Sequence, residues 1–463
     1  MRKSISYIII CVFLIMCIAS PAPTVHASAV TASSTDAAGN RPPEINAKSA
    51  IVMDAKTGQV LYEKDAHSRY YPASITKIMT CYLALTKGNL DSVITMSDQA
   101  IWGIPRDSSH IALDVGEQIT LRDALYAVMM VSANEAAWAV AEEISGSVSA
   151  FADLMNETAA SLGCENTHFV NANGLHDENH YTTAYDMALI TKKALENDTF
   201  REITAATYYE IPPTNLNDET RYLWQDNKLI LEDSEYYYPA CEGGKAGFTD
   251  EAQGTHVAWA KVGDTELICV ILYAKPGLSK YPDIEALFDY CFDNYTYQQP
   301  FAGFTFDGEM LTTASNFLCD HYNCQNAGYM HLEIDTEASA LFPSDIDIKA
   351  LTYQFTPSAE RLDENIIGTL AASYNGLTVD TQPVTYSGFI KSNDPAAIEE
   401  AEKDGTINPA YNASKKKAPW GLIIGGVIIV IGGTFVYARY RYVQEVRRRR
   451  RLAARRRNHE RTR

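Results

Sequence analysis

The chain has 463 residues, and 46% of them are hydrophobic. This content is enough to bury sizeable cores and excludes a largely disordered protein. The formal net charge is −19, and the basic residues are concentrated at the C-terminal end, where 12 arginines follow Trp420. The rest of the chain is therefore strongly acidic, which argues against a nucleic-acid partner. The length predicts two or three domains.

Both ends of the chain carry patterns that are typical of membrane targeting. Residues 1–27 place two basic residues before a short apolar run and small residues after it, which predicts a secretory signal peptide. An uncleaved anchor is the alternative, but the apolar run is short for one. Residues 420–437 are uncharged and mostly apolar, and as a helix rising ~1.5 Å per residue they nearly match a bilayer core of ~30 Å. The arginine-rich tail, 438–463, should remain in the cytoplasm, which predicts a single-pass protein of the cell membrane with an extracytoplasmic ectodomain.

The ectodomain divides by its pattern of apolar residues. Residues 28–47 are rich in small residues and read as a linker. Residues 48–295 show two strands, a helical block, three more strands and a closing helix, which predicts an α/β domain with an antiparallel sheet. Short alternating strands and an Asn-Gly hairpin signal predict a separate small all-β domain over 296–391. Residues 392–419 are rich in acidic residues and then lysines, and are predicted to be a stalk.

Within 48–295 the expected elements can be placed one by one. Gly58 suits the turn between the first two strands, and Thr120 is the expected cap of the second helix. The expected elements are strands at 49–53 and 59–62, helices at 73–86, 121–131, 135–144 and 148–162, a helix capped by Thr182 or Thr183, strands at 255–262 and 266–272, and a helix at 284–292.

The nine cysteines give no recognisable framework. Cys11 and Cys17 fall within the predicted signal peptide, and the seven that remain are an odd and scattered set. Cys319 and Cys324 are close enough in the chain to bridge a short loop or to remain reduced. The spacing of cysteine and histidine does not resemble a zinc site, so we predict no metal and no cofactor.

Ser74 and Lys77 form a Ser-x-x-Lys pattern at the start of the first long helix. Residues three apart share one helix face, which puts the hydroxyl beside an amine that can take its proton. The positive end of the helix dipole also favours an oxyanion. The pattern indicates a serine acyl-transfer enzyme with Ser74 as nucleophile and Lys77 as base. It is weak alone, because Ser414 and Lys417 repeat the spacing in the stalk.

Two further patterns follow in the chain. Ser132 and Asn134 form Ser-x-Asn at the break between two helices, and Lys245 and Gly247 form Lys-x-Gly where a predicted strand opens. Ser-x-Asn also occurs at 373–375 and Lys-x-Gly at 56–58, but hairpin turns explain both of those.

The order Ser-x-x-Lys, helical Ser-x-Asn and strand-borne Lys-x-Gly resembles the penicillin-interacting serine acyltransferases. Within them, the chain looks like a low-molecular-mass penicillin-binding protein of the D-alanyl-D-alanine carboxypeptidase kind. The resemblance is strongest over residues 49–79, 173–188 and 244–252, and it implies the α/β transpeptidase fold of that family. His176, His180 and Asp186 lie in the second of these stretches. For His180 and for Thr182–Asp186 the simplest expectation is that they cap and position a helix.

The resemblance implies a role for each residue of the motifs. Lys77 would act as the base, since burial beside the cation of Lys245 favours a neutral amine. Ser132 would pass the proton to the leaving amine, and Asn134 would bind the substrate backbone. Lys245 would bind the terminal carboxylate of the substrate.

The rest of the expected site lies on the predicted strand. The oxyanion hole would use the backbone amides of Ser74 and Phe248, with Gly247 lining the substrate path. One position departs from the family, which usually has threonine or serine where this chain has Ala246. That hydroxyl would help to hold the substrate carboxylate.

The function implied is removal of the C-terminal D-alanine from peptidoglycan stem pentapeptides, through an acyl-serine intermediate, in cell-wall remodelling. The implied partners are stem peptides that end in D-Ala-D-Ala, β-lactams bound covalently, and the cell membrane through the C-terminal helix. Two alternatives are a β-lactamase and a non-catalytic muropeptide-binding relative, in which Ala246 would mark lost activity. Whether a second stem peptide can replace water as acceptor stays open.

Overall fold

The computed structural model describes residues 30–31, 41–275, 280–323, 330–374 and 377–388. The predicted signal peptide, stalk, transmembrane helix and arginine-rich tail lie outside these residues, as does Cys324. Among the residues that are described, no helix combines the length and the apolar character needed to cross a bilayer. The chain falls into two compact units, Met1–Ala314 with Leu332–Tyr386, and Ser315–His331 with Ser387–Arg463.

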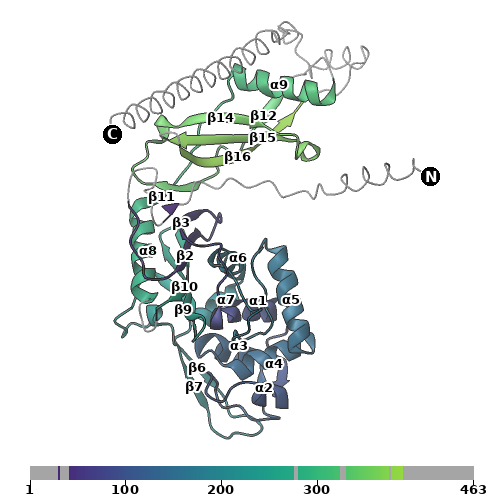
Figure 1. The fold of residues 1–463 in the computed structure, drawn as a ribbon, viewed down its shortest axis with the longest axis vertical. Helices are drawn as coiled ribbons and strands as arrows, with labels where there is room; N and C mark the ends of the chain where they lie inside the picture. The colour runs from purple at the N-terminus through teal and green to yellow at the C-terminus, as the bar shows by residue number, and fades with distance from the viewer. Residues whose placement is uncertain (1–29, 32–40, 276–279, 324–329, 375–376, 389–463) are drawn as a thin grey trace, which may run out of the picture. The chain divides into compact units, whose positions relative to one another are not determined.

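A six-stranded sheet forms the centre of the first unit, with the order β1-β3-β2-β10-β9-β8 (Figure 1). Neighbouring strands are antiparallel, except that β1 runs parallel to β3. Strands from the start and the end of the expected α/β domain therefore meet at the middle of the sheet, and β8 forms its edge. The strands are β1 (Val30–Thr31), β2 (Ser49–Asp54), β3 (Val60–Lys64), β8 (Cys241–Thr249), β9 (Gln253–Val262) and β10 (Thr265–Ala274).

A block of helices packs on one face of this sheet and shares a single core with it (Figure 1). The helices are α1 (Lys77–Lys87), α2 (Asp98–Trp102), α3 (Leu121–Met130), α4 (Asn134–Ser145), α5 (Val148–Ser161), α6 (Ala184–Ala194) and α7 (Asp198–Ala205). Helix α8 (Lys280–Asn294) packs on the other face around a second core. The expected helical block with an antiparallel sheet is confirmed.

Local capping explains where several helices begin. The Thr120 hydroxyl accepts from the Asp123 amide and the Asp123 carboxylate accepts in return, which makes a capping box for α3. Thr183 caps α6 by accepting from the amide of Asp186, in the first turn of the helix. Both caps agree with the expectation from sequence.

Other local expectations were incomplete. The expected helix over 73–86 begins with a separate 3-10 turn, η1 (Ala73–Thr76), and the strand expected to open at Lys245 begins four residues earlier. Helices α2 and α7 were not expected, and neither were two short two-stranded sheets. These pair β4 (Val93–Thr95) with β5 (Gln118–Thr120), and β6 (Tyr208–Ile211) with β7 (Arg221–Trp224).

The segment expected to be all-β contains a helix, so that expectation was wrong. Helix α9 spans Gly308–Tyr322, and Ala314, Leu318 and Cys319 are buried at the spacing of one helix face. The rest is formed by short strands, with β11 paired to β13 and β15 between β14 and β16. The strands are β11 (Tyr295–Gln298), β12 (His331–Glu333), β13 (Ala340–Pro343), β14 (Thr352–Pro357), β15 (Ile366–Tyr374) and β16 (Leu377–Ser387).

Candidate active site

The predicted nucleophile lies in a tight turn. Ser74 belongs to η1, and Ala73 before it has a φ of +51°, in the left-handed region that residues with a side chain rarely adopt. Gly174 packs directly on this turn with a φ of +84°, and a Cβ at Gly174 would lie 1.9 Å from the Ala73 carbonyl oxygen. The surrounding backbone therefore holds the turn that presents Ser74.

Lys77 makes the contacts expected of a base for Ser74. Its Nζ lies 3.0 Å from Ser74 Oγ, 2.7 Å from Asn134 Oδ1 and 2.5 Å from the carbonyl oxygen of Asn173. A neutral amine has two N–H donors and one lone pair. Because the Asn134 and Asn173 oxygens can only accept, they take both donors, and the lone pair is left for the Ser74 hydroxyl.

The surroundings of Lys77 favour that neutral form. The side chain is fully buried, and burial is the main reason that its pKa lies well below 10.5. The positive charge of Lys245 lowers the pKa further, while Asp226 and Glu135 oppose the shift. Burial and the charge of Lys245 both favour the neutral amine, which is the form that can accept a proton.

The Ser-x-Asn pair lies at the break between α3 and α4. Ser132 has a φ of +61° and a buried Oγ that has no hydrogen-bond partner among the described residues. Asn134 begins α4 and contacts Lys77 directly, whereas Ser132 reaches neither Ser74 nor Lys77 by a hydrogen bond in the described chain.

Lys245 lies in the middle of β8 and is also fully buried. Its Nζ donates to the carbonyl oxygen of Ala246 at 3.1 Å and lies 3.7 Å from Asp226 Oδ2. Burial lowers the pKa of Lys245, and Asp226 partly restores it. Asp226, just before the 3-10 turn η2 (Lys228–Ile230), was not predicted, because nothing local marks an acid that meets Lys245 only through the fold.

Strand β8 passes very close to the nucleophile turn. A Cβ at Gly247 would lie 2.8 Å from the Ser74 amide nitrogen and 2.4 Å from Thr255 Oγ1. Thr255 in turn donates to the Pro72 carbonyl at 2.8 Å, which ties the turn to β9. Only glycine allows this approach, which brings the Ser74 amide beside the strand that carries Phe248. The Phe248 side chain is exposed.

The histidine and acid of the 173–188 stretch have structural positions, as the sequence indicated. His180 Nδ1 accepts from the Val170 amide, so Nε2 carries the proton and donates to Thr76 Oγ1 at 2.8 Å. Burial lowers the pKa of His180 to about 3, which keeps the ring neutral. Asp186 accepts from Asn166 and lies in the first turn of α6. His176 packs edge-on against a tyrosine. The Asn173 carbonyl on Lys77 was missed, because a backbone acceptor has no residue signature.

Metal-ligating groupings were not found in the part of the chain that the structure describes. The described residues bring together Ser74, the buried side chains of Lys77 and Lys245, and nearby backbone amides. These are the kinds of group that covalent acyl transfer uses, namely a nucleophile, a base beside it and donors for an oxyanion.

The comparisons with known proteins agree with this chemistry. The family model described as D-alanyl-D-alanine carboxypeptidase matches residues 36–276. D-alanyl-D-alanine carboxypeptidase DacF of Bacillus subtilis is 37% identical over 265 residues, which is 56% of this chain and 65% of that protein, just under two thirds of its length. D-alanyl-D-alanine carboxypeptidase DacC of Escherichia coli is 29% identical over 361 residues, 74% of this chain and 84% of that protein.

A solved structure agrees as well. The Streptomyces K15 DD-transpeptidase aligns with a TM-score of 0.51 and 29% identity, over 54% of this chain and 99% of that one. Since the family model covers more than half of the residues, the chain belongs to the D-alanyl-D-alanine carboxypeptidase family.

Proposed function

We propose that the protein removes the C-terminal D-alanine from peptidoglycan stem pentapeptides through an acyl-enzyme on Ser74. One observation carries the proposal. The buried Lys77 amine lies 3.0 Å from Ser74 Oγ while two fixed oxygen atoms occupy its donors, so its lone pair faces the hydroxyl. Family membership identifies the bond that such a pair would cleave.

In the proposed reaction, Lys77 takes the Ser74 proton as Oγ attacks the carbonyl carbon between the two D-alanines. The oxyanion that forms accepts hydrogen bonds from the amides of Ser74 and Phe248. The C–N bond then breaks, and the proton on Lys77 passes through the Ser132 hydroxyl to the departing D-alanine nitrogen. Lys77 then takes a proton from water as the water attacks the ester carbonyl. The C–O bond to Ser74 breaks, Lys77 returns the proton to Ser74 Oγ, and the shortened peptide leaves as a carboxylic acid.

The substrate is held at its terminal carboxylate. Lys245 supplies the positive charge, and Asn134 supplies an amide group beside the substrate backbone. A β-lactam presents a strained amide and a carboxylate in the same arrangement. The same attack opens its ring and leaves a covalent adduct on Ser74.

The test is covalent labelling by a fluorescent penicillin. The wild-type protein should be labelled on Ser74, as peptide mapping would locate, and should release D-alanine from a D-Ala-D-Ala peptide. Ser74→Ala should lose both activities with an unchanged circular dichroism spectrum, and the matched control Ser414→Ala should keep both. Label that persists in Ser74→Ala would refute the assignment.

We also propose that the protein is anchored in the cell membrane by residues 420–437, with the ectodomain outside the cytoplasm. The arginine-rich tail supports this orientation, because basic flanks stay on the cytoplasmic side. Protease added to intact protoplasts should digest the ectodomain and spare a C-terminal tag. Loss of the tag in sealed protoplasts would contradict the proposed topology.

A further inference from the structure

The two-stranded sheet of β6 and β7 presents a group of aromatic side chains to solvent. Side chains alternate between its two faces, and Tyr208, Tyr222 and Trp224 share the outer one, where they are 39%, 59% and 67% exposed. Glu210 is also exposed and lies opposite Tyr222 on the same face. We call these four residues the aromatic face. Large exposed apolar groups that gather on one face are typical of a binding surface.

The rings of the aromatic face lie close together. Trp224 is directly opposite Tyr208 in the register, and their ring centroids are 4.7 Å apart. The Tyr222 ring lies 6.3 Å from the Tyr208 ring and is tilted by only 14° from it, so both rings are turned the same way. The Tyr208 hydroxyl donates to Glu210, which places a carboxylate at the margin of the rings. The face thus combines flat apolar surfaces with polar groups beside them.

The inner side of the same sheet holds the aromatic face in position (Figure 1). Leu223 is buried in the core of the helical block, and the Tyr209 ring stacks on Tyr126 of α3 with the centroids 3.7 Å apart. The Arg221 guanidinium donates to two backbone carbonyls of the loop over 111–117, at 3.0 Å each. A surface that is already fixed loses little conformational entropy when a ligand binds to it.

The aromatic face is continuous with the reaction site along the chain. Trp224 precedes Asp226 by two residues, so their Cα atoms are at most about 7 Å apart. Asp226 Oδ2 lies 3.7 Å from Lys245 Nζ, and the Asp226 amide donates to the carbonyl of Met130 at the end of α3. The aromatic face is therefore attached to the segment that contacts Lys245.

The chemistry of the face favours a neutral carbohydrate. A sugar ring has a side of C–H groups, which the negative face of an aromatic ring attracts, and hydroxyl groups at its rim, which can donate to a carboxylate. The face carries Glu210 and no lysine or arginine, and Glu210 forms no ion pair within the described chain. Anionic ligands such as nucleic acids or acidic lipids are disfavoured there.

We propose that the aromatic face binds a glycan strand built of N-acetylated hexosamine units, the polymer to which stem peptides are attached. The choice of this polymer rests on the proposed function. Binding holds the enzyme on the polymer and raises the local concentration of stem peptides near Ser74, without any contact to the bond that is cleaved.

The direct test titrates chitohexaose, a soluble chain of N-acetylglucosamine, into the full chain and measures binding by calorimetry. Trp224→Ala should weaken binding by about tenfold or more, because interfaces depend most on their large aromatic anchors. Trp224→Phe keeps a ring and should retain most of the affinity. The matched control is Trp102→Ala, which removes a ring that is 58% exposed on α2, outside the aromatic face, and should bind as the wild type does. No binding by the wild type, or equal binding by Trp224→Ala, would overturn the assignment.

A second measurement relates the aromatic face to the reaction. D-alanine release is measured on insoluble peptidoglycan and on a soluble pentapeptide, and Tyr222→Ala should lower the ratio of the first rate to the second by about tenfold, since only the polymer occupies the face. An equal loss on both substrates would show that the face only supports the fold of the site, and would refute the proposal.

The two proposals can fail separately. If neither substrate is cleaved but chitohexaose binds and Trp224→Ala weakens it, the proposed function fails and the glycan assignment stands. A wild-type dimer in sedimentation experiments that Trp224→Ala converts to a monomer, with no chitohexaose bound, would assign the aromatic face to a second copy of the chain and overturn the glycan assignment.

Discussion

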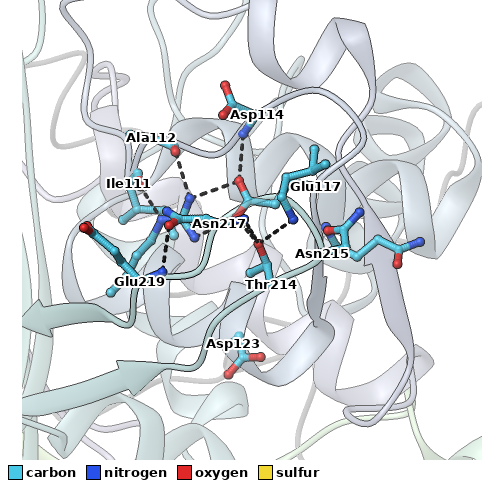
Figure 2. Close-up of polar contacts among 12 residues, drawn as sticks. Ile111, Ala112, Asp114, Glu117, Asp123, Thr214, Asn215, Asn217 and Glu219 are labelled. Atoms are coloured by element: carbon cyan, nitrogen blue, oxygen red, sulfur yellow. Dashed lines mark hydrogen bonds and ion pairs between the residues drawn. The ribbon is translucent and has the colours of Figure 1, made fainter.

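Replacing Arg221 with alanine should destabilise the protein and loosen the loop over 111–117. Arg221 contacts Glu117 Oε1 at 2.7 Å and Oε2 at 3.0 Å, and the Glu117 side chain is fully buried. Figure 2 shows Glu117 in contact with Thr214 and Asp114 as well. Arg221→Ala leaves this carboxylate in place without its counter-charge. Two partners remain, the Thr214 hydroxyl at 2.6 Å and the Asp114 amide at 2.9 Å.

The expected size of the effect follows from this geometry. Removing one partner of a buried ion pair costs about 3–5 kcal/mol. The two partners that Glu117 keeps place this case near the lower end, at about 3 kcal/mol in the free energy of unfolding from urea titrations at pH 7. The matched control is Arg361→Ala, because Arg361 pairs with Glu364 at the surface, where both side chains are about half exposed. That change should cost far less, because water screens an ion pair at the surface.

The effect should also depend on pH. Burial raises the pKa of Glu117, but hydrogen bonds from Arg221 and Thr214 outweigh it and hold the pKa below 4.5. A carboxyl group with a depressed pKa stabilises the fold above its unfolded value and loses that contribution as pH falls through the folded value. The difference between wild type and Arg221→Ala should therefore shrink below pH 4.5. A loss under about 1 kcal/mol at pH 7, or one that is unchanged in acid, would refute the reasoning.

Three further predictions concern the reaction site. Lys245→Met removes a positive charge that lowers the pKa of Lys77, so the acidic limb of the pH profile for penicillin acylation should move to higher pH; an unmoved limb would contradict this coupling. Gly247→Ala puts a Cβ 2.8 Å from the Ser74 amide nitrogen. Acylation measured with fluorescent penicillin should therefore slow by about tenfold or more, while the circular dichroism spectrum stays unchanged. An unchanged rate would show that β8 can move away from Ser74 without loss of activity. Ala246→Thr restores a hydroxyl near the substrate carboxylate and should raise kcat/KM on a D-Ala-D-Ala peptide by about tenfold, whereas an unchanged value would show that the hydroxyl does not bind the substrate.

Features that depend on a few neighbouring residues could be predicted from the sequence. Thr120 and Thr183 cap their helices by accepting from the backbone amides three residues later. Such caps depend only on neighbouring residues, so the local sequence predicts them. The spacing of Ser74 and Lys77 also worked, because one helical turn from the 3-10 segment into α1 brings their side chains together. The helix at α9 was missed, since its buried stripe was read as alternating strands.

Local pattern alone could not choose between the two Lys-x-Gly segments. The segment at Lys56 matches the family motif better, because threonine follows the lysine. However, Thr57 forms part of the turn, where its amide donates to Asp54 Oδ2 at 2.8 Å. Lys56 lies over the Tyr297 ring, 5.2 Å from its centroid. Lys245, by contrast, is buried on the strand that reaches Ser74. Order along the chain, rather than the motif itself, selected Lys245, and the structure shows that its strand passes the Ser74 turn.

The Asn173 carbonyl and Asp226, which contact the two buried lysines, could not be predicted from the sequence for a different reason. The Asn173 carbonyl acts through its backbone, so any residue type could supply it. Asp226 meets Lys245 only because the segment before η2 lies beside the edge of the sheet. Neither interaction is marked by a repeating pattern in the sequence, so both can be predicted only once the long-range fold is known.

At Ala246 the chain departs from the family, so the resemblance does not say which groups surround the substrate carboxylate there. Ala246 pairs with His256 across β8 and β9, so the two side chains share one face of the sheet. His256 is fully buried, neither ring nitrogen has a partner in the described chain, and burial with the charges of Lys280 and Lys245 keeps its pKa well below 6.5. The His256 imidazole is therefore a competing partner for a threonine hydroxyl at position 246, beside the substrate carboxylate that the predicted gain in kcat/KM requires. A bond to the ring raises Tm and leaves kcat/KM unchanged, whereas a bond to the substrate raises kcat/KM, so measuring both on Ala246→Thr identifies which partner the hydroxyl takes.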